Sequence, residues 1–348
     1  MNQSIRIGDI SIGDQFPPFV VAEMSGNHNQ SLDRALAIVD AAADAGAHAI
    51  KLQTYTADTM TLKGVKTIID EKSLWKGEEL HTLYVKAHTP WEWHKAIFDH
   101  ASKRGLICFS SPFDESAVDF LESLNCPAYK IASLENTDHP LLKKVASTKK
   151  PVIMSTAVAT AEEIEESVAV LRNAGCTQLI LLKCTSAYPA KAEDANLLTI
   201  PDMNKRFKCA IGISDHTMGI GVSVAAVALG AVLIEKHFTI SRADGGVDST
   251  FSMEPAEFRT LVDGSLIAWK AIGKVHYDVL ESEKVSAMYK RSIYIGKDIK
   301  AGEIITPAHL RIIRPANGLA PKYYDEVIGK KAKKDLVAGT PLKRDHFE

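Results

Sequence analysis

Residues 19–30, FVVAEMSGNHNQ, begin as a short apolar run and end in polar side chains that can take part in catalysis. The same arrangement recurs seven more times, and stretches with helical patterning fill most of the intervals. Strands that alternate with helices are typical of a parallel sheet, and eight such units in about 240 residues favour a closed (β/α)8 TIM barrel. The apolar runs are 19–23, 49–53, 107–110, 129–132, 152–155, 179–183, 210–214 and 233–237.

The composition is that of an ordinary soluble globular protein with a cytoplasmic location. The chain has 348 residues, 46% hydrophobic and 24% charged, with a net charge of −2. This balance gives no reason to expect nucleic acid or membrane binding, and no apolar run approaches the roughly 20 residues that span a bilayer. The N-terminus lacks the apolar segment of a signal peptide. The five cysteines are scattered and form no CxxC, which predicts buried free thiols.

The chain is predicted to contain two domains. We expect the barrel over residues 1–277, a linker over 278–289 and a small β-rich domain over 290–348. In that last part, residues 297–306 and 334–343 share the pattern D-Φ-x-A-G-x-x-Φ, a short internal repeat with glycines at matching turns. Its 13 Lys and Arg against 7 Asp and Glu favour a basic domain that covers an anionic substrate.

The interval from Thr56 to Thr89 is too long for a simple loop between a strand and a helix. Long loops on the catalytic face of a barrel often shape the substrate pocket, whereas surface decoration is the alternative.

Polar residues at the ends of the predicted strands suggest an anion site. Lys51 and Lys130 are costly to bury unless each meets a negative partner. With serines on neighbouring strand ends they form a plausible cradle for phosphate or carboxylate. Those serines are Ser110, Ser133, Ser155 and Ser214. Lys183 and Lys236 are out of phase with these residues, which favours structural roles.

Two histidines and several carboxylates complete the candidate site. His216 and His237 end consecutive strands, and neutral imidazoles side by side can bind a divalent ion, with Asp215 and Asp248 nearby to orient ligands. Glu23 and Glu135 can act as general acid or base or hold sugar hydroxyls. A salt bridge to Lys51 or Lys130 is the alternative for Glu135. Tyr188 is expected either to bond substrate or to pack.

These residues lie in motifs that resemble the sialic acid synthase family. The matches are AEMSGNHNQ (22–30), IKLQTY (50–55), FSSPF (109–113), KIAS (130–133), MSTA (154–157), CTSAYP (184–189), GISDHT (212–217), EKHFT (235–239) and SMEP (252–255). The segment IIRPANGLAP (312–321) is similar to the family's antifreeze-like, or SAF, domain. The loop GGVDSTFSMEP (245–255) and the segment 74–94 resemble the pseudaminic acid branch.

The resemblance implies an enzyme that condenses phosphoenolpyruvate with an open-chain N-acylated amino sugar, 2,4-diacetamido-2,4,6-trideoxy-altrose, and releases phosphate by C–O cleavage. It implies a homodimer in which the C-terminal domain reaches over the partner's barrel. Glu23, Lys51, Lys130 and Glu135 are the implied catalytic residues, with Glu135 or metal-bound water handling hydration. Phosphoenolpyruvate would meet Lys51, Ser110, Lys130, Ser133, Ser155, Ser186 and Ser214. The sugar would meet Glu23, Gln53, Tyr188, Asp248 and Arg314. His216 and His237 would bind Mn2+, Mg2+ or Co2+.

Three other interpretations remain open at this point. The same chemistry can act on the sugar precursor of N-acetylneuraminate or legionaminate. The chain can instead be a binding protein, with an inactive barrel and a basic domain that grips a polyanionic glycan. It can also be a Schiff-base aldolase with Lys130 as nucleophile.

Overall fold

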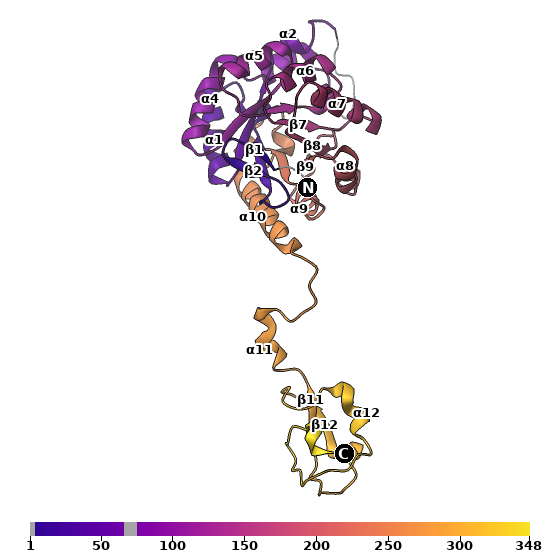
Figure 1. Ribbon diagram of the computed structural model, residues 1–348. Helices are drawn as coiled ribbons and strands as arrows, with labels where there is room; N and C mark the ends of the chain where they lie inside the picture. Colours follow the sequence, from indigo (N-terminus) through magenta and orange to yellow (C-terminus); the bar gives the residue numbers. More distant parts are fainter. Residues whose placement is uncertain (1–3, 66–74) are drawn as a thin grey trace. The chain divides into compact units, whose positions relative to one another are not determined.

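A closed barrel of eight parallel strands forms the larger part of the molecule, as predicted (Figure 1). The computed structural model describes residues 4–65 and 75–348. The strand order around the barrel is β10-β3-β4-β5-β6-β7-β8-β9. The strands are β3 (Phe19–Glu23), β4 (Ala49–Thr54), β5 (Ile107–Pro112), β6 (Tyr129–Ile131), β7 (Val152–Ser155), β8 (Leu179–Cys184), β9 (Ala210–Ser214) and β10 (Leu233–His237).

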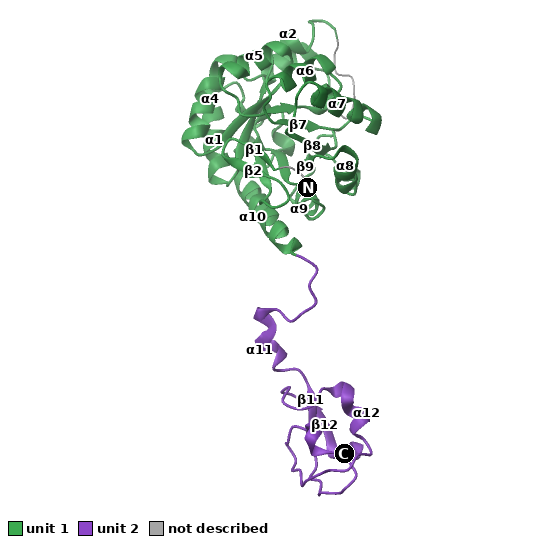
Figure 2. Cartoon of the chain, viewed as in Figure 1, with its two compact units in different colours: residues 1–273 green, residues 274–348 purple. Residues whose placement is uncertain are grey.

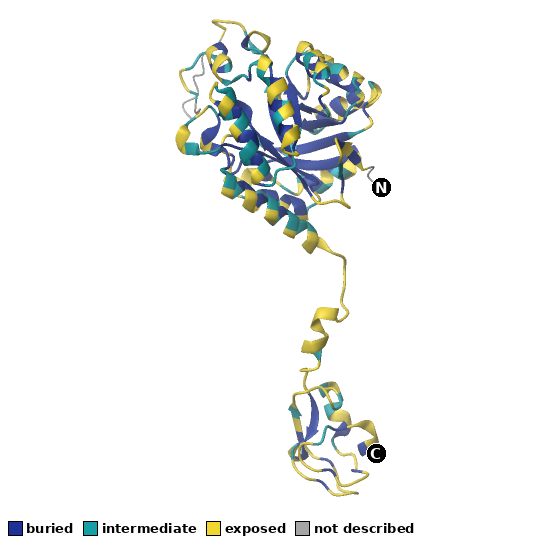
Figure 3. Ribbon diagram, turned by 90° about the vertical axis from the view of Figure 1, so that its left-hand side faces the viewer, coloured by how far each residue is buried: buried dark blue, intermediate teal, exposed yellow. Residues whose placement is uncertain are grey.

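Helices surround the barrel, so each strand is covered on both faces and its apolar run is almost continuously buried (Figure 3). Local signals start several helices: Ser31 caps α1, and Thr160 with Glu163 forms a capping box on α7. The helices of this part are α1 (Leu32–Asp44), α2 (Ala57–Met60), α3 (Leu80–Ala87), α4 (Trp91–Lys103), α5 (Glu115–Ser123), α6 (His139–Ser147), α7 (Ala161–Asn173), α8 (Thr199–Phe207), α9 (Gly221–Ala228) and α10 (Pro255–Ile272).

The two ends of the barrel differ. A hairpin of β1 (Ile5–Ile7) and β2 (Ile10–Ile12) lies at the amino-terminal end, where the Arg6 amide bonds the Gln178 side chain just before β8. At the opposite end, α2 and α3 follow β4 within the long interval expected from the sequence. Residues 66–74, which belong to that interval and include the start of the segment 74–94, lie outside the described residues. The carboxyl ends of the strands are therefore the face that the insertion borders.

Residues Met1–Gly273 and Lys274–Glu348 form two compact units (Figure 2). In the second unit, α11 (Lys284–Ala287) precedes the antiparallel pair β11 (Ser292–Ile295) and β12 (Leu310–Ile313), and α12 (Tyr324–Val327) follows. A separate apolar core that includes Ile293, Leu310 and Leu342 holds this unit together. Within residues 4–65 and 75–348, no helix is both long and apolar enough to cross a membrane.

The two copies of the short repeat pair with each other. Ile299 and Leu336, at equivalent positions, exchange two backbone hydrogen bonds of 2.9 Å each. Asp298 accepts from the amide of Ala338 at 2.8 Å, and Asp335 accepts from the amide of Ala301 at 2.9 Å. The two copies of the repeat are therefore related by an approximate local two-fold axis, and their reciprocal hydrogen bonds join the two parts of the small unit.

Gly212 in β9 marks a tight point of the barrel interior. A Cβ atom there would lie 2.5 Å from the Leu233 carbonyl oxygen and 2.7 Å from Leu182 Cδ2. We expect Gly212→Ala to destabilise the barrel by about 1–3 kcal/mol and to lower Tm measurably in a thermal melt. Gly221→Ala is the matched control, because a Cβ there meets nothing within 4 Å. Equal Tm values for the two variants would contradict this packing argument.

Candidate active site

A cavity of about 290 Å³ opens at the carboxyl ends of the barrel strands. This is the end at which (β/α)8 barrels carry their active sites. Most of the residues proposed from the sequence line it: Glu23, Lys51, Gln53, Lys130, Ser133, Glu135, Ser155, Ser186, Tyr188, Ser214, His216, His237 and Asp248. The strand-end pattern therefore predicted most of one continuous site.

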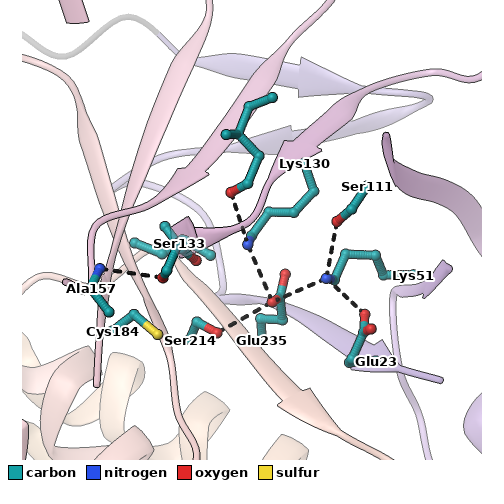
Figure 4. Close-up of polar contacts among 12 residues, drawn as sticks. Glu23, Lys51, Ser111, Lys130, Ser133, Ala157, Cys184, Ser214 and Glu235 are labelled. Carbon is teal, nitrogen blue, oxygen red and sulfur yellow. Dashed lines mark hydrogen bonds and ion pairs between the residues drawn. The ribbon is translucent and has the colours of Figure 1, made fainter. Parts of the chain in front are cut away.

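Two lysines and two glutamates form a buried ion network on the cavity floor (Figure 4). Lys51 Nζ lies 2.8 Å from Glu23 Oε2 and 3.4 Å from Glu235 Oε1. Lys130 Nζ reaches the same Glu235 oxygen at 3.6 Å and donates to the Ile131 carbonyl at 3.2 Å. All four side chains are at most 6% exposed, so their charges act through little screening water.

The two lysines are electrostatically unequal. Burial opposes the charge of Lys51, but Glu23 and Glu235 outweigh burial and raise the Lys51 pKa. Burial dominates at Lys130 and lowers its pKa, although Glu235 partly compensates. The glutamates therefore compensate the positive charge of Lys130 less completely than that of Lys51. Of the two lysines, Lys130 gains more from a bound anion.

Serine hydroxyls surround this network. Ser214 Oγ donates to Glu235 Oε1 at 3.3 Å, and Ser133 Oγ accepts from the Ala157 amide at 3.3 Å. Ser155 Oγ is buried and has no hydrogen-bond partner among the described residues. Because buried hydroxyls are normally bonded, Ser155 indicates a place for a ligand acceptor.

Ser110 is a correction to the expected anion cradle. Its hydroxyl lies 2.6 Å from Thr54 Oγ1, which in turn contacts His94 Nε2 at 2.8 Å, so it faces the surrounding helix layer. The next residue, Ser111, instead accepts a hydrogen bond from Lys51 Nζ at 3.3 Å. Successive side chains of a strand point to opposite faces, and the sequence argument chose the wrong member of the Ser-Ser pair.

Glu235 is the central residue that the sequence reasoning missed. It contacts both lysines and Ser214, and its Oε2 is buried without a hydrogen-bond partner among the described residues. A usable signal was present, because Glu235 stands two residues before His237 in β10 and must share its face.

The two histidines lie side by side, with ring centroids 5.3 Å apart. His216 Nδ1 is 2.8 Å from the Thr185 carbonyl, so this nitrogen carries a proton and Nε2 is the nitrogen that could bind an ion. Burial opposes the charge of His216, but its contacts with Cys184 and the Thr185 carbonyl outweigh burial and raise its pKa. His237 Nδ1 is buried and has no hydrogen-bond partner among the described residues, and burial lowers its pKa well below the usual value. Neutral His237 therefore offers a nitrogen to a divalent metal ion, and His216 would do so once its Nε2 is free of a proton.

Other donors near the histidines are few. Asp248 Oδ2 lies 4.0 Å from His237 Nδ1. Among residues 4–65 and 75–348, no group of three or more His, Cys, Asp or Glu is arranged to hold a metal. Asp215, expected near a ligand, instead pairs with buried Lys236 at 2.9 Å and accepts from Ser223. Lys236 is thus structural, as its phase in the strand predicted.

Candidate sugar-binding residues form a second hydrogen-bonded chain. Gln53 Nε2 donates to Glu23 Oε1 at 2.8 Å and to Ser25 Oγ at 3.2 Å, and Ser25 donates to Asp248. Tyr188 packs against His216 with ring centroids 4.5 Å apart. Arg314 lies in the second unit, where its side chain is exposed.

Glu135 has the properties of an acid or base near neutral pH. Burial raises its pKa to about 7, although Lys130 partly opposes the shift. Its Oε2 is buried and has no hydrogen-bond partner among the described residues. Among the described ion pairs, both cavity lysines contact Glu23 or Glu235 rather than Glu135. The salt-bridge interpretation of Glu135 is therefore not what the structure shows.

The insertion after β4 contributes to the site. Trp75 Nε1 donates to the Val247 carbonyl at 3.2 Å, and the Trp75 ring lies 6.2 Å from that of Tyr188. The insertion thus touches the loop that carries Asp248. The whole arrangement can hold an anion on the lysines, a carbonyl compound near the histidines and a proton on Glu135.

Comparisons with known proteins identify related sequences over the same regions. The model of the NeuB family matches residues 38–277, and that of the SAF domain matches residues 290–348. A pseudaminic acid synthase from Campylobacter jejuni is 43% identical, covering 94% of this chain and 96% of the relative. One from Helicobacter pylori is 42% identical, covering 95% and 98%. The crystal structure of an N-acetylneuraminic acid synthetase from Leptospira borgpetersenii, in complex with citrate, has a TM-score of 0.74 at 33% identity, covering 82% of this chain and 95% of that one.

Proposed function

This chain belongs to the NeuB family, and from that membership and the cavity's chemistry we propose that it is a pseudaminic acid synthase. It condenses phosphoenolpyruvate and water with 2,4-diacetamido-2,4,6-trideoxy-altrose, in its open aldehyde form, to give pseudaminic acid and phosphate. The observation that carries the proposal is that one cavity holds the lysine network, the two adjacent histidines and a carboxyl group whose pKa burial raises to about 7.

The lysine side of the cavity binds phosphoenolpyruvate. Lys51 and Lys130 hold its phosphate and carboxylate, and the unbonded Ser155 hydroxyl donates to one of these groups. Ser133, Ser186 and Ser214 border the same space. Ser111, which bonds Lys51, replaces Ser110 in this proposal.

The bonds change in three steps. C3 of phosphoenolpyruvate attacks the aldehyde carbon and forms the new C–C bond, while the C=O π electrons move to the aldehyde oxygen and positive charge is left at C2. Water adds to C2 and gives up one proton to Glu135, the proposed acceptor, and that proton passes on to the aldehyde oxygen, which becomes a hydroxyl. In the tetrahedral intermediate the C2 hydroxyl becomes the ketone as the bond from C2 to the phosphate oxygen breaks, and its proton leaves with the phosphate, whose charge the lysines stabilise. Glu23, Gln53, Tyr188 and Asp248 orient the sugar.

His216 and His237 are the residues that would hold a divalent ion such as Mn2+, Mg2+ or Co2+. When bound, such an ion polarises the aldehyde oxygen as a Lewis acid. We expect His237→Ala to weaken Mn2+ binding at least tenfold in a calorimetric titration and to abolish the activity that EDTA removes from the native enzyme. His139→Ala is the control, because His139 does not line the cavity. Unaltered Mn2+ affinity in His237→Ala would refute this site.

We also propose a homodimer in which Arg314 contacts the sugar in the partner's barrel. The first residues of the second unit offer exposed apolar side chains for such an assembly, including Val275, Tyr277 and Tyr289 at 87%, 96% and 59% exposure. Arg314→Ala should raise KM for the sugar without weakening Mn2+ binding. Mixing Arg314→Ala chains with Lys130→Met chains should give more activity, through hybrid dimers, than either variant shows alone at a sugar concentration below the raised KM. Failure of mixed, co-refolded chains to regain activity would exclude action in trans.

Phosphate release from phosphoenolpyruvate with Mn2+ tests the proposed reaction. The altrose derivative, N-acetylmannosamine and the legionaminate precursor are supplied in turn. Turnover of the altrose derivative alone is expected, and preference for another sugar would refute the assignment within the family. Borohydride trapping of a Lys130 adduct would support an aldolase instead. Release with none of the sugars would favour a binding protein.

A further inference from the structure

The cavity has apolar as well as polar lining residues. Six apolar residues, which we name the apolar wall, line the cavity beside the polar groups already described. They are Met60, Leu80, Leu83, Ala87, Phe113 and Leu134. Leu134 is 72% exposed and lines the cavity, so its side chain is accessible to a bound ligand.

The position of the apolar wall follows from the topology. Its residues come from segments that follow β4, β5 and β6, including α2 and α3 of the insertion. His216 and His237 belong to the ends of β9 and β10, and β9 stands opposite β5 in the strand order of the closed barrel. A sugar whose aldehyde lies at the histidines therefore directs its far carbons toward the apolar wall.

The chemistry of the wall selects among sugars. The side chains of its six residues carry no charge, amide or hydroxyl, and the polar residues Tyr55, Tyr84 and Glu135 line the same cavity. A hydroxyl placed against this surface loses its water partners without replacement, whereas a methyl group gains from burial. The surface therefore favours a sugar that ends in a methyl group.

We propose that the apolar wall receives the C6 methyl and the C4 acetamido methyl of the sugar, and that it is the determinant of specificity for a 6-deoxy substrate. This inference rests on the proposed function. It assigns the insertion after β4 a role in choosing the substrate rather than in the bond-making steps. The expected preference is about 100-fold in kcat/KM over the analogue that carries a C6 hydroxyl, since an apolar pocket rejects an added hydroxyl by roughly that factor.

The test compares kcat/KM for the altrose derivative and for its 6-hydroxy analogue. In the double variant Met60→Thr/Leu134→Thr, the preference for the 6-deoxy sugar should fall about tenfold. The matched control is Leu62→Thr/Leu198→Thr, which changes two leucines that are 69% and 77% exposed and do not line the cavity. Thermal melts of both variants establish that each is folded.

The outcomes separate the inference from the proposed function. An enzyme that uses the altrose derivative but keeps its preference within twofold in the wall variant overturns the inference alone. The same follows if the control variant loses as much preference as the wall variant. A native enzyme that releases no phosphate with either sugar overturns the proposed function as well.

Discussion

Replacing Lys130 with methionine is expected to lower kcat/KM for phosphoenolpyruvate by about 100- to 1000-fold, the usual cost of removing one group that stabilises developing charge. Lys130 is 2% exposed and shares Glu235 with Lys51, at 3.6 Å and 3.4 Å from the same oxygen. Its loss leaves Lys51 to balance Glu23 and Glu235 alone. The cavity floor then carries one net negative charge more and repels the phosphate and carboxylate of the substrate.

Methionine keeps much of the aliphatic part of the lysine side chain. The decrease in kcat/KM therefore reports the loss of the charge rather than a loss of packing. Lys183→Met is the matched control, because Lys183 lies on β8 but does not line this cavity, and its Nζ donates to the Cys184 carbonyl and the Thr185 hydroxyl. Steady-state assays at saturating sugar give the ratio, and thermal melts show that both variants fold. A loss below tenfold in Lys130→Met would mean that Lys51 alone binds the anion.

The barrel and most of its site could be predicted from the sequence, because the apolar runs mark the strands and the polar residues after each run mark the site. Parallel strands buried on both faces appear as continuous apolar runs, and their carboxyl ends meet at one edge of the barrel. The resemblance to the sialic acid synthase family is confirmed over both units. The internal repeat was visible as a pattern, but its reciprocal Asp298–Ala338 and Asp335–Ala301 bonds needed coordinates.

The errors within the site have one physical source. A fully buried strand shows no alternation of polar and apolar residues, so the side of the sheet that each residue faces is not evident from composition. Ser110 was chosen over Ser111 for this reason, and Glu235 was overlooked beside His237. Counting back by two from His237 would have found Glu235 on the same strand. Choosing Ser111 needed the register of β4 and β5, in which Lys51 pairs with Phe109 and Gln53 with Ser111. The unbonded atoms of Ser155 and Glu135 depend on packing between distant segments and could not be predicted.

Glu135→Gln is expected to lower kcat by about 100- to 1000-fold, within the range for losing a general acid–base group. The substitution should also remove the rising limb of the pH–rate profile near pH 7. Because burial raises the Glu135 pKa to about 7, and because the ionised form accepts the proton of water, native activity should rise with pH through about 7 and then level off. The glutamine variant cannot titrate, so its residual activity should not show that rise.

Stability distinguishes this chemical role from a structural one. A carboxyl group whose folded pKa is raised from 4.5 binds more protons folded than unfolded, so its contribution to stability falls as pH rises from about 4.5 through 7. Glutamine avoids the burial of that charge, and the Tm of Glu135→Gln at pH 8 should equal or exceed that of the native enzyme. Glu193→Gln serves as the control, since Glu193 is exposed and outside the cavity. If Glu135→Gln keeps the rise in activity near pH 7, the ionisation belongs to another group, and Glu135 is not the proton acceptor in the hydration step.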